Sequence, residues 1–495
     1  MRKLILFLCV LIFLTASLAA QQYDLVIAGG RVMDPETGLD AVRNVGIREG
    51  RITRISAEPL TGRRVIQAAS LVVAPGFIDL HQHGQEIESQ RVKAFDGVTT
   101  ALEMEIGVPD VVPFLKSKEG RSLIHYGTTA SHAAARALVF GTPLNPVVIG
   151  AGAGIPEILP KSGPATNQPA TPEQIKQIEQ RLSDELDAGA LGVGMGIQYT
   201  PGATRFEIIE MFRVAAERKL PVYTHVRSFG RSEPGSDIES VEEVIGAAAI
   251  TGASLHIVHI NSTCLLDSLE CLSLISGARA RGLDVTTEAY PYTAGMTILN
   301  SALFNPGWRQ KLGIDYSNLV LPDTGEHLTK ARFEELHNSP NPQSVIMFAN
   351  TQEMVDATIP NPLVMIASDG AAGHPRNAGT YARVLAQYVR EKKTLTLMEA
   401  LCKMTLMPAQ MLERSTPAGR RKGRLQEGAD ADVVVFDPQT IADQATYEKP
   451  MEPSVGVRFL LVAGTVLIDD SKLVPDVFPG RAIVGPGKAG ARKEP

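Results

Sequence analysis

The feature that most constrains this chain is a pair of histidines directly after an apolar run. Residues 71–80 read LVVAPGFIDL, and His81-Gln82-His83 follow at once. Alternate side chains of an extended strand point to the same side, so the two imidazoles could share a metal ion. Taken alone, the pair is equally compatible with two exposed or hydrogen-bonded histidines. Other parts of the chain must show whether the two histidines bind a metal ion.

Three more potential ligands stand at the ends of strand-like runs. They are His225 after LPVYT, His259 after LHIV and Asp369 after LVMIAS. Such runs alternate with helical stretches at 172–188 and 205–219, which is typical of parallel β/α architecture. Parallel strands around a barrel bring their C-terminal ends to one rim, where such barrels assemble their active sites. The sequence therefore predicts an α/β fold, a (β/α)8 TIM-like barrel, with a metal site at its rim.

The barrel is expected to be flanked by parts of both chain ends. Short strand-like runs with turns fill residues 21–72, and comparable runs return within residues 413–495. We expect them to form one small β-sandwich module beside a barrel of residues 73–412. Residues 298–358 break the β/α rhythm with scattered prolines and weakly periodic runs. This predicts an insertion over the rim, either a lid that contacts substrate or a structural excursion.

Residues 1–20 are typical of a secretory signal peptide. Arg2 and Lys3 precede an apolar stretch over residues 4–14, and small residues at 16–20 come before polar ones. The apolar stretch is short for a bilayer span, and no cysteine stands at the cleavage point to carry a lipid. The alternative is an uncleaved N-terminal anchor. We expect a secreted protein, periplasmic or extracellular, without a membrane partner after cleavage.

The net charge bears on nucleic-acid binding, and the cysteine content bears on disulfide formation. The formal net charge of −6 gives no electrostatic case for binding nucleic acid. Beyond the leader, Cys264, Cys271 and Cys402 remain, an odd number without C-x-x-C spacing. Cys264 and Cys271 could pair in an oxidising compartment, but we favour buried thiols.

Taken together, these motifs resemble the metal-dependent amidohydrolase superfamily and, within it, the N-acyl-D-amino-acid deacylases (D-aminoacylases). The superfamily landmarks are PGFIDLHQH at 75–83, the strand-end histidines and SDG at 368–370. The deacylase-like landmarks are GALG at 189–192, YTPG at 199–202, HVR at 225–227, EAYPYTA at 288–294 and the stretch 379–391. The resemblance covers most of the chain beyond the leader, and it implies a barrel flanked by a β-sandwich.

The resemblance also implies the metal ligands. His81, His83 and Asp369 would form one metal position, and His225 with His259 a second. Neutral imidazoles and carboxylates suit zinc, so we expect Zn²⁺ as the cofactor, as one ion or two.

A group that bridges two ions must come from an unusual place in this chain. Many relatives use a carboxylated lysine on the fourth strand, but residues 189–197 contain no lysine. The deacylases place a cysteine near the end of the second strand, where this chain has Ile106. Glu103 and Glu105 share a face of that strand, and Glu105 lies nearer the rim, so Glu105 is the expected ligand. The alternative is a structural carboxylate that pairs with a cation such as Arg227.

Asp369 is the expected catalytic residue. A metal ion lowers the pKa of bound water, so Asp369 could take its proton and then protonate the leaving amine. Its sequence context, SDG, is also typical of turns, which is the alternative role.

Four residues are expected to contact the substrate: Arg227, Tyr199, Tyr290 and Asn261. Deacylase substrates carry a free carboxylate, which Arg227 could bind with two hydrogen bonds, with hydroxyls of the tyrosines adding donors. In the alternative, Arg227 pairs with an acidic residue and the tyrosines only pack. The deacylases follow the sixth-strand histidine with a His and a Lys that contacts substrate, whereas this chain reads His259-Ile260-Asn261. Asn261 would then serve a different polar end group.

Three other histidines lie outside the expected ligand set. We expect His132 to be a core histidine bonded to backbone, His374 to border the substrate, and His256 to have no evident role.

The leading hypothesis is a zinc-dependent hydrolase of a linear amide C–N bond, an N-acyl-D-amino-acid deacylase or a related small-peptide hydrolase. Its expected partner is a small-molecule substrate with an amide bond and a free carboxylate. A cyclic amidohydrolase of the dihydroorotase or hydantoinase kind is the second hypothesis, against which the missing fourth-strand lysine counts. A noncatalytic metal-binding barrel is the third, against which the complete ligand set counts.

Overall fold

The computed structural model describes residues 23–142, 163–339, 341 and 343–487. The predicted signal peptide at 1–20 lies outside these residues. No helix of the described part is long and apolar enough to cross a membrane.

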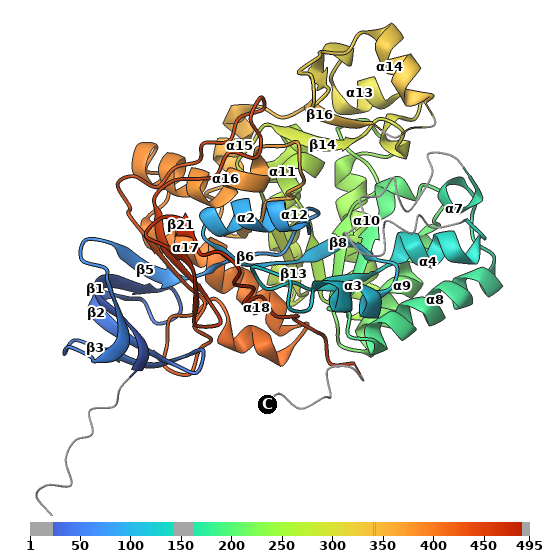
Figure 1. Ribbon diagram of the computed structural model, residues 1–495. Coiled ribbons are helices and arrows are strands. Elements are labelled where there is room, and N and C mark those ends of the chain that lie inside the picture. Colours follow the sequence, from blue (N-terminus) through green and yellow to red (C-terminus); the bar gives the residue numbers. More distant parts are fainter. Residues whose placement is uncertain (1–22, 143–162, 340, 342, 488–495) are drawn as a thin grey trace, which may run out of the picture.

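Parallel strands form the centre of the molecule (Figure 1), seven of them in one sheet and two in another. These strands are β6 (Phe77–Asp79), β7 (Val98–Ala101), β8 (Glu103–Val108), β9 (Thr128–Ser131), β10 (Val193–Gly196), β11 (Val222–His225), β12 (Leu255–Ile257), β13 (Val285–Ala289) and β17 (Val364–Ile366). Neighbouring strands pair in parallel from β8 to β17 and from β6 to β7. An isolated parallel bridge between Gln82 and Gly370 joins the segments that follow β6 and β17. This arrangement is consistent with the predicted (β/α)8 barrel.

Helices cover the outside of these parallel strands. They are α2 (Ile87–Phe95), α3 (Val111–Lys118), α4 (His132–Val139), α8 (Pro172–Asp187), α9 (Arg205–Glu217), α10 (Asp237–Thr251), α12 (Ser268–Ala280), α15 (Gln352–Thr358), α16 (Arg376–Arg383), α17 (Leu397–Leu401) and α18 (Met407–Glu413). In α8, for example, Ile175, Ile178, Leu182 and Leu186 are buried at helical spacing, and Thr171 closes a capping box with Gln174. The largest apolar cluster lies between these helices and the strands.

Both chain ends meet in a separate, nine-stranded sheet, shown in blue and orange-red on the left of Figure 1. Its strands are β1 (Tyr23–Asp34), β2 (Leu39–Arg48), β3 (Arg51–Ser56), β4 (Gly62–Gln67), β5 (Val72–Pro75), β18 (Val433–Phe436), β19 (Val457–Val462), β20 (Thr465–Asp469) and β21 (Lys472–Leu473). Antiparallel pairing of β5 with β18 joins the two ends. The expected two-layer sandwich stays a prediction, because strand pairing defines one sheet.

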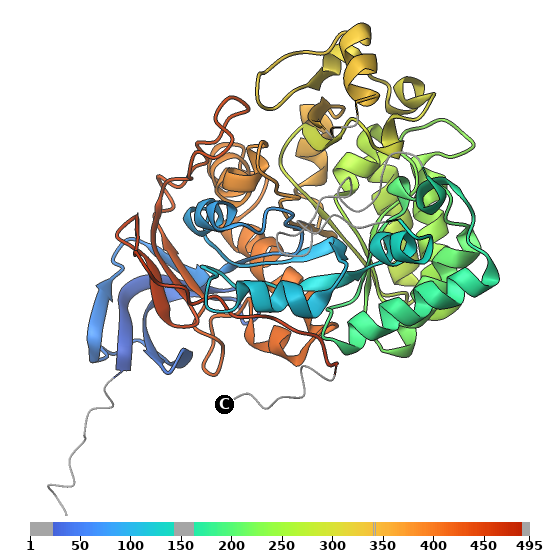
Figure 2. The same cartoon turned by 45° about the vertical axis from the view of Figure 1, so that its right-hand side comes forward.

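An insertion lies between β13 and β17 and projects away from the nine-stranded sheet in both views (Figure 1, Figure 2). It contains a three-stranded antiparallel sheet and two short helices: β14 (Ala294–Ile298), α13 (Trp308–Leu312), β15 (Leu319–Val320), α14 (Lys330–His337) and β16 (Ser344–Phe348). Its apolar core also takes in Phe229 and Leu265 from barrel loops. The insertion is therefore anchored to the rim by shared hydrophobic packing.

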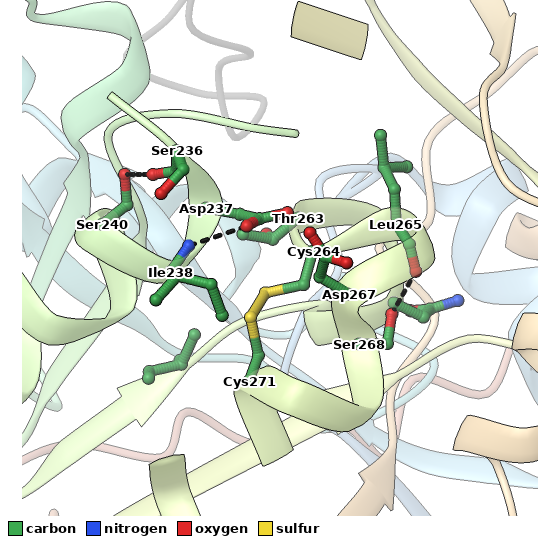
Figure 3. The surroundings of a disulfide bond; sticks show 12 residues. Ser236, Asp237, Ile238, Ser240, Thr263, Cys264, Leu265, Asp267, Ser268 and Cys271 are labelled. Carbon is green, nitrogen blue, oxygen red and sulfur yellow. Dashed lines mark hydrogen bonds between the residues drawn. A yellow bond between two sulfur atoms is a disulfide. The ribbon is translucent and has the colours of Figure 1, made fainter. Parts of the chain in front are cut away.

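The cysteine prediction was wrong. Cys264 and Cys271 form a disulfide, with their Cα atoms 6.6 Å apart (Figure 3). The short helix α11 (Ile260–Thr263) and the turn after it fold back onto α12, which brings the two residues together. Cys402 is free.

Candidate metal centre

Six predicted ligands converge at the C-terminal ends of the barrel strands. His81 and His83 follow β6, Glu105 lies within β8, His225 ends β11, and His259 and Asp369 follow β12 and β17. Their side-chain donor atoms fall into two groups, and Glu105 belongs to both. Strand direction therefore assembles the cluster, as the sequence pattern indicates.

The first group has the dimensions of a tetrahedral site. Nε2 of His81 and Nε2 of His83 lie 3.2 Å apart. Oε2 of Glu105 lies 3.2 Å from the first of these nitrogens and 3.1 Å from the second. Oδ1 of Asp369 lies 3.4 Å and 3.2 Å from the same two atoms. Four donors around a zinc ion with bonds of about 2.0–2.1 Å stand about 3.3 Å apart. The donor set thus fits a zinc-sized cation.

The second group is a triangle around the other oxygen of Glu105. Oε1 lies 2.7 Å from Nδ1 of His225 and 2.9 Å from Nε2 of His259. The two ring nitrogens lie 3.1 Å apart. One carboxylate therefore faces both groups with different oxygens, as a ligand that bridges two ions must.

Burial and charge together favour a cation here. Burial lowers the pKa of His81, but Asp369 and Glu105 outweigh it and hold that pKa well above its ordinary value. Burial raises the pKa of Glu105, but His81 and His225 outweigh it and hold that pKa well below its ordinary value. The cluster thus keeps its carboxylates ionised and attracts positive charge. A metal ion provides that charge while leaving the imidazoles neutral.

Outer partners fix which ring nitrogen faces the cluster in His81, His83 and His259. Nδ1 of His81 lies 2.6 Å from Oε1 of Glu288, and Nδ1 of His83 lies 2.8 Å from Oε2 of Glu103. Nδ1 of His259 lies 3.1 Å from the hydroxyl of Thr263. Such partners hold the tautomer that leaves Nε2 free to bind metal. Glu103, the second carboxylate on its strand, therefore acts behind the cluster.

Backbone strain marks two ligand positions. His259 and Asp369 have φ angles of 32° and 50°, in the left-handed region that few non-glycine residues adopt. Strain of this kind gathers at functional sites, where surrounding structure holds side chains in place.

Comparison with known proteins agrees with this geometry. The sequence model described as "Amidohydrolase family" matches residues 72–467. The chain belongs to the amidohydrolase family. It is a hydrolase of carbon–nitrogen bonds.

Two curated relatives come from Alcaligenes xylosoxydans xylosoxydans. An N-acyl-D-glutamate deacylase is 32% identical over 94% of this chain and 97% of the relative. A D-aminoacylase is 29% identical over 90% of this chain and 94% of the relative. Among solved structures, an N-acyl-D-glutamate deacylase from Bordetella bronchiseptica, complexed with zinc and a phosphonate inhibitor, has a TM-score of 0.77 and 27% identity, covering 94% of this chain and 100% of that one.

Sequence reasoning missed two functional neighbours of the amidohydrolase centre, Glu288 and His256. Both are buried, and Oε2 of Glu288 lies 3.0 Å from Nε2 of His256. Burial raises the pKa of Glu288, but His81 and His256 outweigh it and lower the pKa to about 2. The available signal was a carboxylate next to the C-terminal end of β13, the end at which the metal ligands gather.

Arg376 was also missed, although it follows Asp369 closely. Its Nη2 lies 2.9 Å from Oδ2 of Asp369, and its guanidinium stacks 4.6 Å from the ring centroid of Tyr290. The side chain is buried, yet Nε and Nη1 have no hydrogen-bond partner among the described residues. A buried cation with two unused donors beside the metal cluster is suited to an anionic group of the substrate.

Of the four residues predicted to contact substrate, Arg227 is already paired with an acidic residue, whereas the other three lie near the cluster or near Arg376. Arg227 donates from Nε and Nη2 to both oxygens of Glu243, so its guanidinium already has a carboxylate partner. The Tyr199 ring lies 5.0 Å from that of His225, at the cluster. Tyr290 lies under Arg376, and Asn261 donates from Nδ2 to the backbone oxygen of Tyr290.

The two remaining histidines, His132 and His374, belong to neither group of candidate ligands. His132 does not bond to backbone as expected; its Nε2 lies 2.9 Å from Glu207, which also pairs with Arg136 inside the protein. Nε2 of His374 lies 3.1 Å from the backbone oxygen of Ala294. The partner of His132 stands on a distant helix, which local sequence cannot indicate.

Proposed function

We propose that this enzyme is a zinc-dependent deacylase that cleaves the linear amide of an N-acyl-amino acid, with D-amino acids as the preferred substrates. The observation that carries the proposal is the buried Arg376, with two unused donors, beside the tetrahedral donor set. Arg376 suits a substrate carboxylate, and the donor set suits the metal that activates an amide. The names of the two deacylase relatives support the D configuration.

The residues present fit zinc as the cofactor. Imidazole and carboxylate donors at tetrahedral spacing are the ligands that zinc prefers, and His81, His83, Glu105 and Asp369 would hold the first ion. His225 and His259, with Glu105, would hold a second. When bound, zinc supplies a Lewis acid that polarises the scissile carbonyl and makes water more acidic.

Asp369 is placed to move the proton. Burial raises the pKa of Asp369, but Arg376 and His81 outweigh it and hold that pKa well below its ordinary value. The resting group is therefore a carboxylate that can accept the proton of the attacking water. The same oxygen can then deliver that proton to the departing amine nitrogen.

Arg376 orients the substrate. Nη2 has two hydrogens, and Asp369 takes one of them, so the other can join the free N–H of Nε or of Nη1 in paired hydrogen bonds to a substrate carboxylate. The amide would then lie between this guanidinium and the metal ligands. Carboxylate binding, the role predicted for Arg227, thus falls to Arg376, because Arg227 is paired with Glu243.

We also propose that the protein is secreted. The disulfide between Cys264 and Cys271 supports this, because such bonds persist in oxidising compartments such as the periplasm.

The proposed function is tested by amine release from paired N-acetyl-D- and N-acetyl-L-amino acids, with mature protein, added zinc and a chelated control. Cleavage of the D series that requires zinc is the expected result. Zinc-dependent cleavage of dihydroorotate or a hydantoin, with none of the acyl amino acids, would instead indicate a cyclic amidohydrolase.

A further inference from the structure

A cavity of about 30 Å³ lies where the insertion meets the barrel rim. Gln198, Ser228 and Phe229 line it from barrel loops, and Leu303, Trp308 and Lys311 line it from the insertion. This volume has room for one or two oxygen atoms of the size of water. The cavity is thus large enough for the end of a side chain.

The cavity lies on the far side of Phe229 from the metal centre. The ring of Phe229 contacts that of His225 edge-on, with centroids 5.3 Å apart. Gln198 precedes Tyr199, whose ring lies 5.0 Å from the same histidine. A group held in the cavity is therefore separated from the candidate metal ligands by about one aromatic ring.

Polar atoms without partners face this space. Oε1 of Gln198 is buried and has no hydrogen-bond partner among the described residues. Lys311 forms no ion pair within the part of the chain that the structure describes. Its ammonium lies on the same side as the Ser228 hydroxyl: a Cβ atom placed on Gly235 would stand 3.3 Å from Nζ and 3.8 Å from Oγ.

The acidic residues of the neighbouring loop already have partners. Glu239 accepts from the backbone nitrogen of Gly235 and pairs with Arg205. Glu233 accepts from the hydroxyl of Ser236. Lys311 thus keeps its positive charge available to a ligand.

Close backbone packing fixes the position of Lys311. Gly230 has a φ of 77°, and a Cβ atom there would stand 1.7 Å from the backbone oxygen of Lys311. Only glycine permits this approach. The ammonium is therefore carried by a firmly docked segment.

We propose that this cavity is a subsite for a carboxylate at the end of the substrate side chain. The proposal rests on the proposed deacylase function and names its substrate class, the N-acyl derivatives of acidic amino acids with a short aliphatic stem. Lys311 supplies the charge, and Ser228 and the Gln198 amide supply hydrogen bonds, since either end of that amide can face the ligand. The apolar walls of Leu303 and Trp308 accept the methylene groups of the stem.

The test compares kcat/KM for N-acetylglutamate and N-acetylnorvaline, whose side chains match in length but differ in charge, each as D and L forms. We expect the wild-type enzyme to favour glutamate and Lys311→Met to lower the glutamate-to-norvaline ratio about tenfold, the size of one hydrogen bond to a charged group. Lys311→Arg should retain much of the preference. Lys330→Met, at an exposed lysine of α14 away from the cavity, should leave the ratio at the wild-type value. An equal ratio in wild type and Lys311→Met overturns the proposal.

A binding measurement separates this proposal from the proposed function. Calorimetric titration of the zinc-loaded enzyme with glutarate and with butyrate should show tighter binding of glutarate, with the difference lost in Lys311→Met. If that holds while no acyl amino acid is hydrolysed, the subsite stands and the deacylase function fails. Equal binding of the two acids to the wild-type enzyme overturns the subsite.

Discussion

Glu105 and His225 connect the two halves of the metal centre, with Oε1 of the carboxylate 2.7 Å from Nδ1 of the imidazole. The other carboxylate oxygen faces His83 at 3.1 Å. Glu105 thus lies between the two candidate ligand groups, as predicted, where many relatives are expected by resemblance to have a carboxylated lysine or a cysteine. Its two oxygens would let it bridge two ions without any covalent modification.

Glu105→Gln should therefore remove one metal equivalent. Glutamine keeps the shape but loses the charge, and its nitrogen cannot bind a metal ion, so the second position should empty while the first weakens. We expect zinc content, measured by mass spectrometry after dialysis, to fall from two ions per chain to one or fewer. Glu119→Gln, at an exposed carboxylate, is the control. Two tightly held ions in Glu105→Gln would contradict the bridging role.

Asp369→Asn should separate metal binding from proton transfer. Asparagine tolerates the left-handed φ of 50° and retains one oxygen for the metal, but it cannot accept a proton at that atom. We expect zinc to remain bound and kcat to fall by a factor of about 10²–10⁴, the usual contribution of a general acid–base group. Near-normal turnover by a zinc-loaded variant would exclude the proton-transfer role.

Arg376→Met should abolish selectivity for a free carboxylate. Two hydrogen bonds to a charged group contribute about 3 kcal/mol or more, so kcat/KM for an N-acyl-amino acid should fall at least about 100-fold. The matching N-acyl-amino acid amide should lose much less. Arg227→Met is the comparison variant, because Glu243 already binds that guanidinium. A selectivity loss in Arg227→Met alone would restore the role predicted from sequence.

Local pattern predicts the metal ligands but not the residues behind them. His225 and His259 end strands, and strand direction alone brings them to one rim. Glu288 reaches His81 from a strand 207 residues later in the chain, so their contact depends on barrel closure.

The sequence pattern does not predict side-chain contacts between a helix and another part of the chain either. The His132 ring finds Glu207 on α9, and Arg376 turns back from α16 toward Asp369. The spacing of apolar residues predicts the order of strands and helices along the chain. These contacts depend instead on where each helix packs, with an accuracy of about the length of one side chain.

Lys403 gives a pH dependence of stability that is independent of the metal centre. Its ammonium is buried and donates to the backbone oxygens of Asn361 and Val364. Burial lowers the pKa of Lys403 to about 8 from its ordinary 10.5. The unfolded chain therefore binds more protons than the folded one between these values, so this residue's contribution to stability is present above about pH 10.5 and is lost as pH falls through about 8.

Lys403→Met should remove that contribution and its pH dependence. A shift of this size corresponds to about 3 kcal/mol. The free energy of unfolding, from urea titrations, should rise between pH 8 and pH 10 by more in the wild-type protein than in the variant. Subtracting the two curves removes the contribution of other titrating groups, and the absolute loss of the two hydrogen bonds does not affect the slope. Parallel curves for the two proteins over this interval would show that Lys403 keeps an ordinary pKa in the folded state.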